Sequence, residues 1–167
     1  TGGGIGTGGT LTVTNSSIVN NQSADRSAGL RIAALGNVTL NSSHVDNNHA
    51  DGSFAGGIGT VGTLTVNGGT INNNQAKTDG GGVYTLGGSV TLNGVTVEGN
   101  HADSDSNASG NGGGLYISGG TIVNLTTGTV IGGAAAGQGN TAVNGGGIWN
   151  TGTLNSNQVL YRYNTAS

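Results

Sequence analysis

Ionisable side chains are few, and their spacing limits the chemistry that this chain can support. Charged residues make up 7% of the 167 residues, with four Lys or Arg against seven Asp or Glu. A polysaccharide lyase or hydrolase needs clustered carboxylates, usually beside a basic group or a calcium ion. We expect no catalytic residues, with a carbohydrate-active enzyme as the alternative, because the acidic side chains are dispersed. They are Asp25, Asp46, Asp51, Asp79, Glu98, Asp103 and Asp105.

One polar segment has the alternating oxygen side chains of a cation-binding loop. The run Asp103-Ser104-Asp105-Ser106-Asn107 resembles the start of an EF-hand loop, in which such oxygens converge on a hard cation. The Gly of the sixth place is replaced by Ala108, and the Glu of the twelfth place by Gly114. The candidate Ca²⁺ ligands are therefore Asp103, Asp105 and Asn107, with a solvated insertion as the alternative. We expect no other cofactor.

The first glycines match a nucleotide-binding motif by composition only. Gly4-Ile5-Gly6-Thr7-Gly8-Gly9 fits G-x-G-x-x-G, but that motif requires a strand before it and a helix after it. Here a Thr-Leu-Thr-Val strand follows, and similar glycines recur throughout the chain. With four basic residues in all, the chain also lacks the basic patch that grips phosphates. We expect no nucleotide site and no nucleic-acid partner.

The three histidines do not form a metal site on spacing alone. His49 and His101 share one position in a repeat but stand two repeats apart. In a stacked fold that separation is roughly 10 Å, which is too long for a shared ion. His44 is expected to stand alone opposite a column of Ser or Thr. The chain has no Cys, which excludes disulfides and thiolate ligands.

The element that must position these residues is a repeat of about 26 residues. Aligning Gly-(Thr/Ser/Asn)-apolar-x-apolar gives successive spacings of 27, 26, 26, 32 and 32 residues. The register residues are Leu11, Val38, Leu64, Val90, Ile122 and Leu154. A fixed period of this length indicates a solenoid, in which stacked units form the core together. The 37 Gly residues would otherwise suggest a disordered chain.

Each unit reads as short strands separated by Gly and Asn corners. A glycine pair and an apolar residue come first, as in Gly56-Gly57-Ile58, and an alternating strand such as Thr63-Leu64-Thr65-Val66 follows. Gly tolerates positive φ, and Asn enters the left-handed region more readily than most residues. We predict an all-β chain, a single right-handed parallel β-helix (β-solenoid) of about six coils with three short strands per coil. It forms one domain, 1–167, with repeats starting near 2, 28, 55, 80, 112 and 145.

Each unit closes with an apolar residue followed three positions later by Asn. In a parallel stack, identical Asn residues form a hydrogen-bonded ladder. The predicted rungs are Asn21, Asn48, Asn74, Asn100, Asn140 and Asn164. In the fifth unit Val130 is separated from its Asn by an insertion at 131–138, and a second insertion, 103–111, separates units four and five. Both insertions are expected to be surface loops.

Two outward columns are candidate binding surfaces. The position after the opening apolar residue holds Tyr84, Tyr116 and Trp149 in the last three units, an exposed ridge able to stack on sugar rings. The alternative is an aromatic ladder that only stiffens the sheet. The other column is a hydroxyl face that resembles the ice-binding face of some antifreeze proteins. It contains Thr12, Thr39, Thr65 and Thr91, flanked by Thr10, Asn37, Thr63, Ser89, Thr121 and Thr153, and we expect Val123 and Asn155 to end it.

The Gly-Gly-apolar opening and apolar-x-x-Asn closing resemble the polymorphic outer-membrane protein repeat, with signatures Gly-Gly-Ala-(Ile/Leu/Val) and Phe-x-x-Asn. This chain lacks the Ala, and Ile, Val or Tyr stands in place of Phe. The resemblance implies an extracellular adhesive β-helix, as in autotransporter passengers and bacterial surface adhesins. We therefore expect a structural or adhesive rod at the cell surface, with a glycan or host-surface ligand and no membrane insertion.

The ends of the chain match each other. It begins at a glycine opening, ends after an apolar-x-x-Asn closing, and contains no Met. We expect either six repeats from a longer, processed surface protein, with flanking repeats as partners, or a subunit that stacks head to tail with itself.

Overall fold

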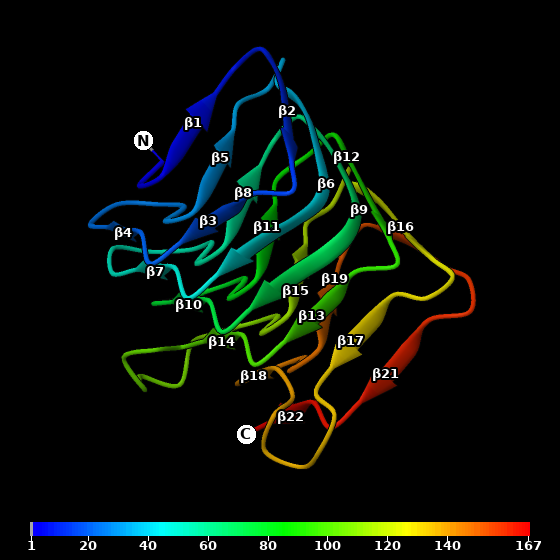
Figure 1. Cartoon of the computed structure of the whole chain (residues 1–167). Helices are drawn as coiled ribbons and strands as arrows, with labels where there is room; N and C mark the ends of the chain where they lie inside the picture. Colours follow the sequence, from blue (N-terminus) through cyan, green and yellow to red (C-terminus); the bar gives the residue numbers. More distant parts are fainter. Residues whose placement is uncertain (1) are drawn as a thin grey trace.

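The computed structural model describes residues 2–167, and within this range every regular element is a β-strand. All strand pairs are parallel and join one turn of the chain to the next. The chain therefore winds into a parallel β-solenoid of about six turns, with its two ends at opposite ends of the stack (Figure 1). The predicted all-β solenoid is confirmed. Residues 2–167 contain no helix of the length and apolar character that crosses a bilayer.

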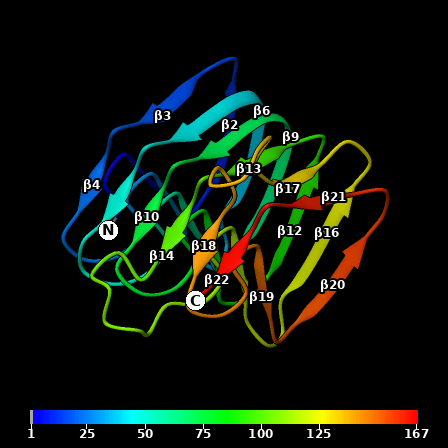
Figure 2. The same ribbon diagram turned by 90° about the horizontal axis from the view of Figure 1, so that it is seen from below.

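Three sheets run along the stack, and the first two contain one strand from each turn. The first sheet consists of β1 (Ile5–Thr7), β5 (Leu30–Ile32), β8 (Ile58–Thr60), β11 (Val83–Thr85), β15 (Leu115–Ile117) and β19 (Ile148–Asn150). The second consists of β4 (Gln22–Ser23), β7 (His49–Ala50), β10 (Gln75–Ala76), β14 (His101–Ala102), β18 (Thr141–Ala142) and β22 (Thr165–Ala166). Viewed from below, the turns follow one another along a common axis (Figure 2).

The third sheet is folded along its length into two faces. Its strands are β2 (Thr10–Thr14), β3 (Ser17–Val19), β6 (Asn37–Asp46), β9 (Thr63–Asn72), β12 (Ser89–Asn93), β13 (Thr96–Glu98), β16 (Ile122–Thr126), β17 (Val130–Gly132), β20 (Thr153–Ser156) and β21 (Leu160–Arg162). Four of the six turns therefore contain four strand segments, where the sequence predicted three. In the second and third turns, β6 and β9 each bend through the fold line as one long strand.

Left-handed residues form the corners, as the Gly and Asn content predicted. At the fold line of the third sheet each turn has a residue with positive φ, and the third turn has two: Asn15, Ser42, Gly68, Gly69, Gly94, Gly128 and Gln158. A second corner lies immediately before the closing Asn of most turns, at Asn20, Asn47, Asn73, Gly99 and Tyr163. Gly and Asn adopt this conformation at low cost, whereas Ser42, Gln158 and Tyr163 adopt it at a higher cost.

The predicted register is correct in five turns and shifted by one residue in the fifth. Val123, and not Ile122, pairs with Val90 and Leu154. Ile122 points outward with 47% of its surface exposed, because the corner before β16 has one extra residue. The same correction applies after the fold line, where Ile131 replaces Val130 as the partner of Val97.

The core is a set of aliphatic columns enclosed by the three sheets. In the inner turns these side chains are fully buried, with Leu40, Leu64, Ile71, Leu92 and Leu125 among the largest. The first and last turns bury theirs only in part, as at Ile5, Leu11, Ile148 and Leu154. The predicted insertion 103–111 is a loop between β14 and β15. The insertion expected at 131–138 begins only after Gly132, because Ile131 is a core residue of β17.

Candidate functional site

The predicted asparagine ladder is present over all six turns. Each side-chain amide donates from Nδ2 to Oδ1 of the Asn in the next turn, over 2.8 to 3.0 Å. The backbone N–H of the same residue donates to that Oδ1 as well. The second Nδ2 proton binds a carbonyl of the preceding turn, as from Asn74 to Val45. Inner rungs such as Asn48 and Asn74 are fully buried, so the ladder is structural.

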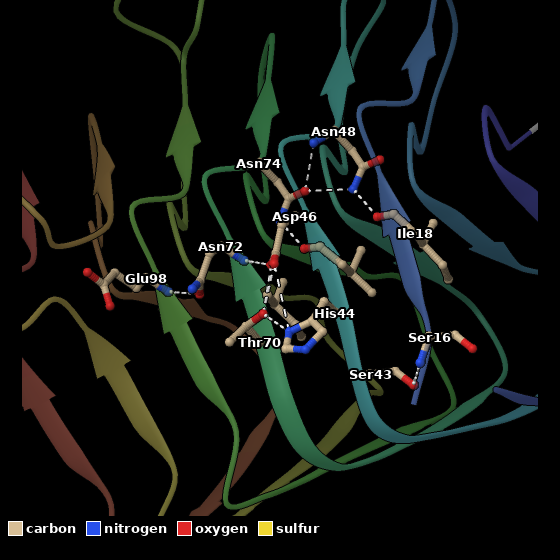
Figure 3. A network of polar contacts seen from close by, with 12 residues as sticks. Ser16, Ile18, Ser43, His44, Asp46, Asn48, Thr70, Asn72, Asn74 and Glu98 are labelled. Carbon is tan, nitrogen blue, oxygen red and sulfur yellow. Dashed lines mark hydrogen bonds and ion pairs between the residues drawn. The ribbon is translucent and has the colours of Figure 1, made fainter. Parts of the chain in front are cut away.

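His44 lies in the predicted column of Ser and Thr, between Ser17 and Thr70 in the register, and it also belongs to a polar cluster. Its Nδ1 lies 2.7 Å from Thr70 Oγ1, which lies 2.9 and 3.0 Å from the two carboxylate oxygens of Asp46 (Figure 3). Asp46 Oδ1 also accepts the backbone N–H of Asn72 at 2.8 Å. In the arrangement of a hydrolytic triad the imidazole would stand between hydroxyl and carboxylate, whereas here the hydroxyl stands between them. We therefore assign this cluster a structural role: it joins the second turn to the third through hydrogen bonds.

The other two histidines occupy the repeat position that was predicted, two turns apart. The register aligns Gln22, His49, Gln75 and His101 in the second sheet. His49 Nε2 lies 2.9 Å from Asp51 Oδ1, and His101 Nδ1 lies 2.6 Å from Thr141 Oγ1. Within residues 2–167 no three His, Asp or Glu side chains are grouped so as to hold a metal ion.

The candidate calcium loop is held together by its own oxygens. Both carboxylate oxygens of Asp103 accept backbone N–H groups, from Asn107 at 3.0 Å and Ala108 at 3.2 Å. Asp105 Oδ2 accepts the Asn107 amide and lies 3.7 Å from the Lys77 ammonium. Ca²⁺ binding by Asp103, Asp105 and Asn107 stays a prediction, and it requires a cation to replace these contacts.

The aromatic column has the predicted register. Tyr84, Tyr116 and Trp149 pair with one another across β11, β15 and β19. The rings of Tyr84 and Tyr116 stack with centroids 4.7 Å apart and planes inclined by 17°. Exposure increases along the column, from 8% at Tyr84 to 36% at Trp149. The ridge predicted to be exposed is therefore covered at its Tyr84 end.

The side chain of Phe54 covers Tyr84, and the sequence pattern did not predict this contact. The column position before Tyr84 is Gly59, beside which Ser27 packs, and Phe54 covers Tyr84 from the loop after β7. Its ring stacks on Tyr84 at a centroid distance of 4.1 Å. The Arg26 guanidinium carbon lies 5.2 Å from the centre of the Phe54 ring, within cation–π range. No repeat spacing relates Phe54 to the column, so periodicity could not identify it.

The covered end of the column changes the acidity of its first tyrosine. Burial raises the pKa of Tyr84 to about 12, with smaller contributions in the same direction from Tyr116 and Asp79. Arg26 acts in the opposite sense, because a cation favours the phenolate. Tyr84 is thus a neutral hydrogen-bonding group at any physiological pH.

Next to this stack lies the hollow that we identify as the candidate ligand site. It has a volume of about 210 Å³ and opens on the outer face of the first sheet, over β5, β8 and β11. Gly59 lies between Arg31 and Tyr84 in the register, and the Ser27 side chain occupies the position where its Cβ would stand. The polar and aromatic lining is Arg26, Ser27, Arg31, Phe54, Thr60 and Tyr84.

The hydroxyl face keeps its main column and changes in its flank. Thr12, Thr39, Thr65 and Thr91 lie in register on successive turns. Asn124 and Asn155 continue the column, so Val123, which is buried in the core, was the wrong residue for the fifth turn. In the flanking column Ile122 takes the place predicted for Thr121, which is buried at a corner.

Comparisons with protein families, with curated proteins and with solved structures found no significant match. The functional interpretation therefore depends on the geometry of this chain.

Proposed function

We propose that the chain is an extracellular, non-enzymatic structural and adhesive β-solenoid, a segment or subunit of a bacterial surface rod. Stacked at roughly 4.8 Å per turn, six turns form a rod section of roughly 29 Å. Its core and its asparagine ladder run through every turn without interruption. Such a scaffold transmits load along its axis and displays loops and outward columns at its sides.

The observation that carries the proposal is the complementarity of the two ends. At one end Asn164 has a backbone N–H and an amide proton with no ladder acceptor within residues 2–167. At the other end Asn21 Oδ1 receives no donor from the same part of the chain. These are the groups that meet between inner turns, as from Asn48 to Asn74. A first turn therefore fits onto a last turn.

The apolar positions support the same view. In the last turn Ile148 and Leu154 are only partly covered, and 45% of the Tyr161 side chain is exposed. They occupy the columns of Ile5, Leu11 and Ile18 in the first turn. Terminal strands with one unpaired edge invite another strand. We propose flanking repeats of a longer chain, or a second copy stacked head to tail, as the partner of these turns.

Head-to-tail stacking is tested by sedimentation velocity and electron microscopy over a rising concentration series. We expect rods longer than one molecule. Asn164→Asp places a carboxylate against the acceptor oxygen of Asn21 and should abolish stacking, because two acceptors repel. Asn155→Asp adds the same charge to the same turn on the exposed face and serves as the matched control. A monomer at every concentration would contradict stacking between copies.

The surface location draws support from the resemblance to the polymorphic outer-membrane repeat. It is tested by labelling intact, unpermeabilised source cells with an antibody raised against the chain. We expect labelling before permeabilisation. Labelling that appears only after permeabilisation would contradict the extracellular role.

Ice binding is a second candidate function, favoured by the register of the threonine column. Thr12, Thr39, Thr65 and Thr91 repeat at the interval of one turn on the outer face. If the protein binds ice, an osmometer should record thermal hysteresis with shaped ice crystals. The Thr65→Val variant should lose this hysteresis. Hysteresis equal to that of the buffer would remove this candidate.

A further inference from the structure

We propose that the hollow bordered by Arg26, Arg31, Phe54 and Tyr84 binds a carboxylated sugar ring. The inference rests on the proposed adhesive function and names its ligand class. Two of the four basic residues of the chain line this one hollow, although the chain has a formal net charge of −3. A local concentration of cations on an acidic protein favours an anionic ligand.

The two guanidinium groups are available to such a ligand. The Arg31 backbone pairs within the first sheet, whereas its guanidinium makes no hydrogen bond or ion pair with any residue in the range 2–167. Arg26 pairs with Asp25 over 3.8 Å, but both side chains are more than half exposed, so the contact is weak. Guanidinium groups bind carboxylates through two parallel hydrogen bonds, which fixes both the position and the orientation of the acid.

The remaining lining suits a sugar ring better than an acidic peptide. Phe54 and Tyr84 line the hollow with their ring edges, because their faces are occupied by each other, by Tyr116 and by Arg26, and these apolar edges pack against the C–H groups of a pyranose. The volume of about 210 Å³ is below the roughly 300 to 1,000 Å³ of sites that take a drug-sized molecule. The hollow therefore accommodates one ring of a longer glycan.

The neighbouring column gives the glycan a direction. Tyr116 and Trp149 continue the aromatic surface away from the hollow, one turn at a time, with exposure increasing toward Trp149. One acidic ring held at the arginines can thus be followed by further rings along the exposed aromatic side chains. The predicted glycan-binding residues Tyr84, Tyr116 and Trp149 become the continuation of an anionic subsite.

Calorimetry at millimolar ligand provides the test, with two matched probes. Cellotriose and the trimer of glucuronate differ only in carrying a hydroxymethyl group or a carboxylate on each ring. We expect the glucuronate trimer to bind about 10-fold more tightly or better, since hydrogen bonds to charged groups are the stronger ones. A triglutamate peptide distinguishes an acidic sugar from an acidic peptide and should bind more weakly than the glucuronate trimer.

Three variants locate the binding. Arg31→Gln and, independently, Arg26→Gln should each weaken glucuronate binding about 10-fold. Lys77→Gln removes the same charge elsewhere on the surface and should leave it unchanged. Equal affinity for the two sugars, no binding of either, an equal loss in Lys77→Gln, or triglutamate binding as tight as glucuronate would each overturn the proposal. Stacking of the rod is measured without ligand, so failure here is distinguishable from failure of the proposed function.

Discussion

The side-chain amide of Asn74 lies 3.0 Å from the point at which a Cβ on Gly57 would stand. The glycine opening and the asparagine closing of one turn are therefore in contact across the interior. The same relationship recurs between Gly82 and Asn100, at 3.0 Å. It explains why the two motifs occur together in the repeat, because the ladder needs a neighbour without a side chain.

Gly57→Ala should destabilise the fold by about 1 to 3 kcal/mol, the usual cost of overpacking. The added Cβ would meet the carbonyl oxygen of Gly82 at 2.5 Å, a backbone atom that cannot rotate away. Gly9→Ala is the matched control, because no atom lies within 4 Å of its Cβ and its φ is ordinary. Urea unfolding measures both, and equal midpoints for the two variants would contradict the packing argument.

Asn74→Ala should lower the free energy of unfolding by about 3 kcal/mol or more. It removes the acceptor of the Asn48 backbone N–H and of one Asn48 amide proton, and it removes the amide that bonds the carbonyl of Val45, while Oδ1 of Asn100 keeps only the backbone N–H of residue 74. Asn67 belongs to an exposed ladder, in which water replaces the lost bond. Asn67→Ala should therefore change stability by less than about 0.5 kcal/mol. Similar losses at both positions would show that burial of the ladder is unimportant.

Tyr84 should ionise well above the usual pH range of a tyrosine, because burial raises its pKa. Its raised pKa means that the folded state retains a proton that the unfolded state loses above pH 10. Stability is therefore fully present below pH 10 and declines as the pH rises toward 12, by up to about 1.4 kcal/mol per pH unit. Phenolate absorbance should show a late phase that Tyr84→Phe lacks. A single phase near pH 10 in the wild type would contradict the burial of this hydroxyl.

Removing residues 133–138 should leave the fold intact. The deletion joins Ile131-Gly132 to Gly139-Asn140 and restores the apolar-x-x-Asn spacing of the other turns. Residues 134–138 are exposed, and Ala135 and Gln138 bond to each other. Unfolding midpoints should be unchanged or slightly higher, since a shorter loop costs less entropy to close. Removing 66–71 from β9 is the control that should abolish folding. A loss above about 2 kcal/mol in the first deletion would contradict the prediction.

Periodicity predicted the stacked architecture because the core columns leave a direct trace in the sequence. The predicted register was one residue too early in the fifth turn, because Gly120-Thr121-Ile122 matches the pattern of Gly62-Thr63-Leu64. In the structure Thr121 lies at the corner before the strand. The alternation of Val123 and Leu125 with their partners Val90 and Leu92 contained the correct register. A match to alternation over the whole strand would have found it.

The candidate site was only partly predictable. The aromatic column repeats with the turns and was found, whereas Phe54 and Arg26 come from loops without a fixed spacing. The hollow lies where these two loops meet the outer face of β5, β8 and β11. Contacts between irregular segments depend on three-dimensional packing, which no period encodes.

The most direct test of the central claim is a tandem chain in which Ser167 of one copy is joined to Thr1 of the next. If the ends are complementary, the fused chain forms one continuous rod of roughly 58 Å. It should unfold in one cooperative transition at a higher urea concentration than the single copy, because a buried interface replaces two open ends. Small-angle scattering and urea unfolding together give the answer. Two separate bodies that unfold at the single-copy midpoint would contradict the account.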